Sequence, residues 1–152
     1  MTRLARRAPA SGFAAVAALL ALAVTSGCYE GYAGAPPLRL WSDDLAYQVF
    51  VAPAPPIARE NAEFRVVIRD KHSGQAIEGG EGRIFATSHD GISAWDGLTP
   101  GKQPGTYTAK LNFITAGDWP MGIQFRRDST KPIQRLDWVQ AVVVPTDETP
   151  KK

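Results

Sequence analysis

The sequence contains very few of the residues that build disulfides or soft metal sites. Its 152 residues include one cysteine, two histidines and two methionines. A single cysteine excludes an intrachain disulfide, and copper sites with soft ligands need clusters of histidine or methionine. His72 and His89 are well separated and lie in turn-forming segments, while Met121 follows the pattern of a core residue. We therefore expect no bound metal and no cofactor.

Motifs of known catalytic chemistry are absent as well. The sequence has no G-x-S-x-G, no H-E-x-x-H and no glycine-rich phosphate loop. Asp43 and Asp44 are adjacent in an extended segment, so their side chains point to opposite sides. A calcium site on Asp90 and Asp96 would lack the ligand spacing of a known calcium loop. The sequence therefore predicts a protein that is not an enzyme.

A basic surface of the kind that binds nucleic acid is also missing. The chain has 17 basic and 15 acidic residues, but Arg3, Arg6 and Arg7 belong to the first few residues. Without residues 1–27 the balance is 14 basic against 15 acidic residues, a formal charge of −1. Nucleic-acid binding requires a concentrated positive face, so we expect no nucleic-acid partner.

The N-terminus has the three parts of an export signal. The basic stretch RLARR is followed by twelve uncharged residues, FAAVAALLALAV (13–24), and then by the small residues Ser26 and Gly27. This arrangement is typical of a secretory signal peptide. The apolar run is shorter than the roughly 20 residues that span a bilayer. We expect a signal helix over residues 1–27.

The single cysteine, Cys28, follows this segment directly. The stretch VTSGC resembles the bacterial lipobox, in which small residues precede a cysteine that becomes lipidated. The resemblance implies a diacylglyceryl and palmitate anchor on Cys28, which holds a protein to a membrane stably when two or more acyl chains are present. A free reactive thiol or an intermolecular disulfide is the alternative. Tyr29, in place of aspartate, favours the outer membrane if the source is Gram-negative.

The remaining chain divides into three parts. Residues 28–37 are rich in glycine, alanine and proline and predict a flexible tether. Residues 38–145 are long enough for one domain with one core. Residues 146–152 are polar and predict a disordered tail. The protein should therefore be a single domain on the periplasmic or extracellular face of the cell envelope.

Within that domain the apolar residues alternate with a period of two. No window has the 3.6-residue period of a helix. The segments with strand character are residues 47–53, 63–70, 82–88, 105–113, 118–127 and 136–144. Turn residues separate them every 8 to 14 positions. The pattern predicts an all-β domain, an Ig-like antiparallel β-sandwich of about seven strands.

Two of these segments resemble a known family. PGTYTAKLNF and AGDWPMGIQF, with FRVVIRDKHSGQ before them, resemble the YtkA-like and FixH-like bacterial domains over roughly Phe64 to Phe125. The matching positions are Asp70, Gly74, Pro104, Gly105, Tyr107, Phe113, Gly117 and Trp119. The resemblance implies a β-sandwich with an accessory role, linked in FixH-like members to oxidase or cation-transport assembly. For this fold we expect the Tyr107 hydroxyl to bond to backbone at a corner of the sandwich.

The residues that could contact a partner lie between the strands. Trp95 is in the long polar connection 88–105, where an exposed indole could stack on a sugar or anchor a protein. Alternatively, Trp95 caps the open end of the sandwich. Arg126 and Arg127 begin a basic loop over 126–135 that could meet a partner or anionic headgroups.

The leading hypothesis is a lipid-anchored, noncatalytic binding or accessory module of the envelope. Its partners would be the membrane, through the anchor, and an envelope protein or glycan. The alternatives are a periplasmic copper-handling protein of the CopC-like type and a cell-wall carbohydrate-binding module.

Overall fold

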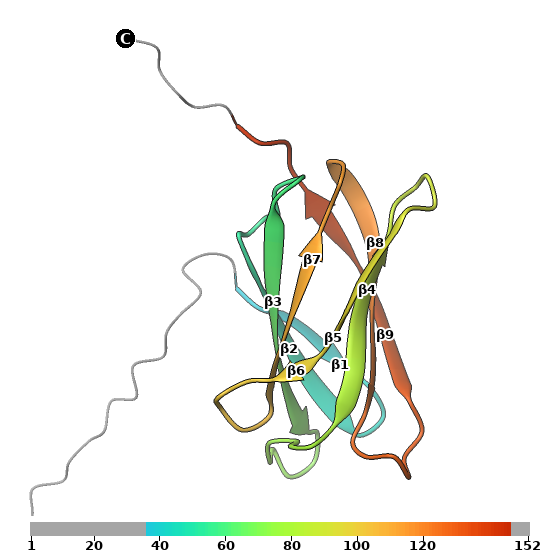
Figure 1. Cartoon of the computed structure of the whole chain (residues 1–152). Helices are drawn as coiled ribbons and strands as arrows, with labels where there is room; N and C mark the ends of the chain where they lie inside the picture. The colour runs from blue at the N-terminus through green and yellow to red at the C-terminus, as the bar shows by residue number, and fades with distance from the viewer. Residues whose placement is uncertain (1–35, 147–152) are drawn as a thin grey trace, which may run out of the picture. The chain divides into compact units, whose positions relative to one another are not determined.

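The chain folds into two antiparallel sheets packed face to face. The structure is a computed structural model that describes residues 36–146. Among these residues it has nine strands and no helix (Figure 1). The strands are β1 (Leu38–Trp41), β2 (Leu45–Ala52), β3 (Asn61–Asp70), β4 (Glu81–Thr87), β5 (Ser93–Gly97), β6 (Thr99–Pro100), β7 (Thr106–Asn112), β8 (Gly117–Arg126) and β9 (Gln134–Val142). This confirms the all-β, Ig-like sandwich.

The two sheets differ in strand number and in their edges. One sheet has the order β1-β2-β3-β7-β6 and the other has the order β5-β4-β8-β9. All neighbouring strands are antiparallel. β4 and β8 are therefore interior strands of the second sheet, while β5 and β9 are its edges.

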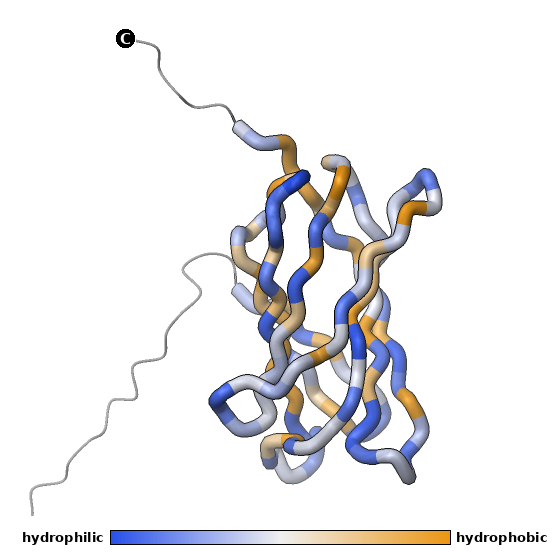
Figure 2. Tube along the Cα trace, in the orientation of Figure 1, coloured by the Kyte–Doolittle hydropathy of each residue, from blue (hydrophilic) through white to orange (hydrophobic). Residues whose placement is uncertain are grey.

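The core lies between the sheets and consists of alternate residues of the long strands. Figure 2 shows the alternation of hydrophilic and hydrophobic residues along β3 and β7. The residues expected to point inward from β3, β7 and β8 are all buried: Phe64, Val66, Ile68, Tyr107, Ala109, Leu111, Trp119, Met121, Ile123 and Phe125, followed by Phe113 just after β7. Edge-to-face contacts join their rings, including Tyr107 to Phe125 and Phe113 to Trp119, each at 5.2 Å. Such pairs add stability beyond the burial of their area.

The expected contact of the Tyr107 hydroxyl is present. It donates to the carbonyl of Ile77 at 2.8 Å and accepts from the N–H of Gly80 at 3.1 Å. This ties β7 to the connection between β3 and β4. Gly105 precedes the strand with a φ of +69°, and a Cβ there would lie 2.7 Å from the carbonyl oxygen of Ile68. Glycine is thus required both by the backbone conformation and by the close approach of β3.

Three strands are not among the six segments expected from the sequence. β1, β5 and β6 are short, and all three pair with only one neighbouring strand. β5 and β6 divide the expected long connection 88–105, so Trp95 lies on a strand rather than in a loop. No membrane-crossing helix occurs among residues 36–146. The signal helix, Cys28, most of the tether and most of the tail lie outside the described residues.

Candidate functional site

The outer surface of the second sheet carries an unusual set of side chains. Because successive residues of a strand point to opposite faces, the residues that alternate with the core positions of β5, β4, β8 and β9 share this surface. We call it the Trp95 face and define it by Trp95, Phe85, Arg83, Gly122, Gln124, Arg126, Arg135 and Asp137.

Two aromatic side chains occupy neighbouring strands toward the β5 edge of this face. Trp95 on β5 pairs with Phe85 on β4, and Phe85 pairs with Gly122 on β8. The Trp95 side chain is 67% exposed, whereas Phe85 is half-buried. The alternative in which Trp95 caps an open end of the sandwich is therefore wrong, since the indole points outward from the sheet.

Gly122 allows the Phe85 ring to lie close to the sheet. A Cβ at Gly122 would lie 2.3 Å from Cζ of Phe85 and 2.9 Å from Oδ1 of Asp137. The ring thus occupies the space above a residue without a side chain. Arginines flank it, with the guanidinium carbon of Arg135 at 5.0 Å and that of Arg83 at 5.9 Å from the ring centre. Cation–π contacts at such distances help to fix the ring.

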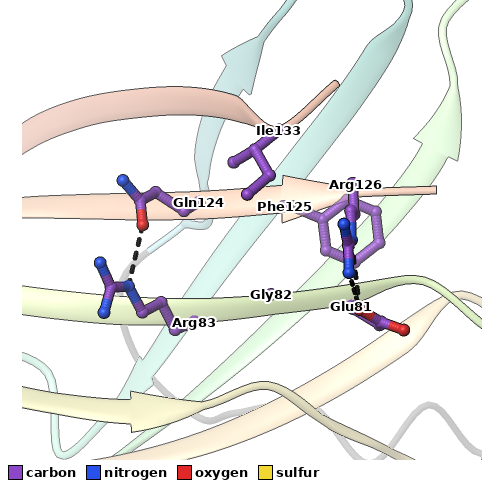
Figure 3. A pocket seen from close by; sticks show the side chains of 7 residues that line it. All are labelled: Glu81, Gly82, Arg83, Gln124, Phe125, Arg126 and Ile133. Carbon is purple, nitrogen blue, oxygen red and sulfur yellow. Dashed lines mark hydrogen bonds and ion pairs between the residues drawn. The ribbon is translucent and has the colours of Figure 1, made fainter. Parts of the chain in front are cut away.

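A groove lies farther along β4 and β8, toward Glu81 and Arg126. It has a volume of about 400 Å³ and is lined by Glu81, Gly82, Arg83, Gln124, Phe125, Arg126 and Ile133. Figure 3 shows two polar bridges across it. Arg83 Nε donates to Oε1 of Gln124 at 2.8 Å, and Arg126 pairs with Glu81 at 2.6 Å. Ile133 supplies an apolar side chain, 60% exposed, beside these bridges.

The structure separates the two arginines that the sequence placed together. Arg126 belongs to the Trp95 face, so the strand pairing brings it to the same surface as Trp95. Arg127 turns the other way and forms ion pairs with Asp44, at 3.0 Å, and with Asp70. Arg135, at the end of the same loop, pairs with Asp137 at 2.9 Å. The loop over 126–135 is therefore not a free basic patch.

The cluster around Arg127 joins the two sheets. Besides its ion pairs, Arg127 donates to the carbonyl oxygen of Asp44 at 3.2 Å. Asp70 also accepts the N–H groups of His72 and Ser73 at 2.9 and 2.7 Å. The Arg127 guanidinium, followed by these N–H groups, holds the pKa of Asp70 far below its usual range. These contacts assign Arg127 to the structure of the domain.

The metal-ligand candidates do not converge. His72 follows β3 and His89 follows β4, and because β4 runs between the two turns the histidines lie at opposite ends of the sandwich (Figure 1). Met121 is buried in the core. Asp96 accepts the backbone N–H of Lys110 on β7 at 2.8 Å. Across residues 36–146 no group of three or more His, Cys, Asp or Glu side chains is placed to hold a metal.

Sequence reasoning singled out Trp95 and Arg126 but missed Phe85, Arg83 and Gly122. One signal was available, because Phe85 alternates with Ile84 and Ala86 and therefore had to point away from the core. The position of Gly122 beneath Phe85 depends on the pairing of β4 with β8. Two further tryptophans lie elsewhere in the sandwich: Trp41 on β1 is 58% exposed, and Trp138 on β9 packs against the core.

No protein-family model and no curated protein matches the sequence. Similar solved structures exist. One is a DUF4426 family protein from Pseudomonas aeruginosa PAO1, with 15% identity, a TM-score of 0.56, and coverage of 71% of this chain and 95% of that one. Another is FetP from uropathogenic Escherichia coli F11, expressed in the periplasm, with 11% identity, a TM-score of 0.55, and coverage of 74% and 98%.

A copper-bound single-substitution variant of FetP is also similar, with 8% identity, a TM-score of 0.52, and coverage of 77% of this chain and 96% of the other. At such identities a likeness establishes shared architecture. The chain has the Ig-like β-sandwich fold found in these bacterial proteins.

Proposed function

We propose that the protein is a noncatalytic binding or accessory module of the bacterial cell envelope, and that it binds its partner through the Trp95 face. The observation that carries this proposal is Trp95 itself. Its indole is 67% exposed on a strand, beside a Phe85 ring held over Gly122. Exposed aromatic side chains on a rigid element are frequent anchors of recognition. Asp137, the carboxylate of this face, is paired with Arg135 at 2.9 Å, so the polar side chains suit the binding and orientation of a ligand.

The envelope location rests on the leader and on Cys28. The signal-like residues 1–27 and the VTSGC stretch support export followed by acylation of Cys28. The expression of FetP in the periplasm is compatible with an exported domain of this fold. The resemblance to YtkA-like and FixH-like domains supports an accessory role, linked in FixH-like members to the assembly of a respiratory oxidase or a cation transporter.

The binding role can be tested by sedimentation with isolated cell envelopes of the source bacterium. Residues 29–152 contain the whole described core and lack the leader. We expect this chain to sediment with envelopes and Trp95→Ala to stay in solution. Trp41→Ala is the control, because Trp41 is equally large and 58% exposed but lies on the other sheet.

Both substitutions should change the free energy of unfolding by no more than about 0.5 kcal/mol, as is usual at exposed positions. Equal sedimentation of wild type and Trp95→Ala would refute the assigned face. Labelling of the full chain with radioactive palmitate tests the anchor. Label should appear on wild type and be lost in Cys28→Ala, and an unlabelled wild type would refute acylation.

A copper-handling role is the second candidate. It is favoured by the copper-bound FetP variant, whose fold is similar. In this chain the exposed His72 and His89 are the available soft ligands among the described residues, and they lie at opposite ends. Titration with Cu(I) and Cu(II) tests the role. Binding that is no tighter than to an unrelated protein with surface histidines would exclude it.

A further inference from the structure

We infer that the ligand of the Trp95 face is an uncharged glycan chain, with one sugar ring on Trp95 beside Phe85 and the following sugar units in the groove along β4 and β8. This inference rests on the proposed binding function. It adds the chemical class of the ligand and the direction in which the ligand lies.

The first argument is the form of the aromatic surface. The face of an aromatic ring carries negative electrostatic potential, and the C–H groups of a sugar ring present a flat, weakly positive surface. The exposed indole of Trp95 lies beside Phe85, which Gly122 allows to rest close to the sheet. Arg135 and Arg83 lie over the Phe85 ring, so the exposed indole of Trp95 is the platform for a flat ring, and Phe85 borders it on the adjacent strand. A bulky side chain at Gly122 would raise Phe85 out of this position.

The second argument is the arrangement of the polar groups. They occur as bridged pairs of a donor and an acceptor: Arg83 with Gln124, Arg126 with Glu81 and Arg135 with Asp137. Sugar hydroxyls both donate and accept, so they can bond to the outer atoms of each pair. An anionic ligand would instead have to compete with Glu81 for Arg126 and with Asp137 for Arg135, whereas Arg83 is bonded to the neutral amide of Gln124. The pairing therefore favours hydroxyl groups over carboxylate or phosphate.

The third argument is length. Phe85, Arg83 and Glu81 follow one another on the same face of β4. At a strand rise of about 3.3 Å per residue, Phe85 and Glu81 are roughly 13 Å apart. The groove of about 400 Å³ lies at the Glu81 end. The site is therefore long enough for several linked sugar rings.

A protein partner fits the face less well. A stable protein interface buries about 800 Å² on each side around an apolar centre. The exposed apolar side chains here, Trp95, Val139 and Ile133, lie on three different strands or loops. Charged pairs such as Arg135 with Asp137 lie between them. The face thus has one aromatic cluster surrounded by polar side chains, and it lacks the broad apolar centre of a protein interface.

The test is a glycan array, followed by titration with the best soluble oligosaccharide while tryptophan fluorescence is recorded. Residues 29–152 should bind neutral oligosaccharides, and the affinity should change less than twofold between 0.1 and 1 M NaCl. Trp95→Ala and Phe85→Ala should each weaken binding at least tenfold. Gly122→Val should weaken it as well, because its side chain displaces Phe85. Trp41→Ala should leave the affinity unchanged.

The outcomes distinguish a failure of the glycan inference from a failure of the proposed binding function. Binding only to acidic glycans, abolished by salt, would overturn the assignment of an uncharged ligand. No glycan binding, with envelope sedimentation still dependent on Trp95, would refute the glycan ligand and leave the binding function standing. Glycan binding that Trp41→Ala abolishes and Trp95→Ala does not would place the site on the other sheet and refute both the face and the inference.

Discussion

Two buried tyrosines allow the contribution of the Tyr107 hydroxyl to stability to be measured against a matched control, Tyr47. Tyr107 and Tyr47 are each 1% exposed, and both rings contact Phe125 edge to face. The Tyr107 hydroxyl bonds to Ile77 and Gly80, whereas the Tyr47 hydroxyl makes no well-formed hydrogen bond within residues 36–146. The Ser42 hydroxyl is close enough to Tyr47 to oppose the rise of its pKa caused by burial, but its own hydrogen bond goes to the carbonyl of Leu45 at 3.5 Å. Replacing each tyrosine by phenylalanine keeps the ring and removes only the hydroxyl.

The expected costs differ strongly. Tyr107→Phe leaves a buried carbonyl at Ile77 and a buried N–H at Gly80 without their partner. An unpaired buried polar group costs about 1–3 kcal/mol, so we expect a loss of about 2–6 kcal/mol for the two together. In a domain of this size that lowers Tm by roughly 10–30 °C. Tyr47→Phe removes an unsatisfied hydroxyl, so its unfolding free energy should stay within about 0.5 kcal/mol of wild type or rise.

Urea unfolding followed by tryptophan fluorescence measures both variants in the same way. Equal m-values would show that the midpoints report stability alone. The reasoning fails if Tyr107→Phe unfolds within about 0.5 kcal/mol of wild type, or if Tyr47→Phe costs as much as Tyr107→Phe.

Three further comparisons use pairs or single sites from the same domain. Gly105→Ala should destabilise more than Gly74→Ala in urea, because both have positive φ but only Gly105 has backbone within 2.7 Å of a new Cβ; equal losses would contradict this. The contacts that lower the pKa of Asp70 stabilise the fold at pH values above the unfolded-state pKa of about 3.9. This stabilisation is lost as the pH falls from there toward the lower folded-state pKa. Asp70→Asn should therefore flatten the fall in Tm between pH 5 and pH 2, and an unchanged slope would refute the linkage. Arg127→Met should cost more than Arg126→Met, which breaks one exposed ion pair; the reverse order by thermal unfolding would contradict the assigned roles.

The strands with long apolar alternation were predictable from sequence. In β7 and β8 every second residue from Tyr107 to Leu111 and from Trp119 to Phe125 faces the core as expected, because one face of each strand packs between the sheets and the other faces outward. The Tyr107 hydroxyl contact was predictable for a similar reason, since a buried hydroxyl must find a partner.

The short edge strands were not predictable in the same way. β5 has the sequence SAWDG, which contains no run of apolar residues, and its strand character comes from pairing with β4. Trp95 therefore looked like a loop residue. The close contact of Phe85 with Gly122 joins positions far apart in the chain, and a single sequence carries no signal for such a register. Arg126 and Arg127 separate because neighbouring residues of an extended chain point in opposite directions.

The placement of Phe85 and Gly122 on interior strands has a consequence for affinity and for variation. β4 and β8 are hydrogen-bonded on both sides, so the contact groups lose their conformational freedom when the domain folds, and association with a ligand does not incur that entropy cost again. The hairpin tips at 88–92 and 128–132 lie beyond the strands that hold this surface and do not include Ile133 of the groove. Insertions at those tips should change the loops and leave the contact residues on β4 and β8 in place.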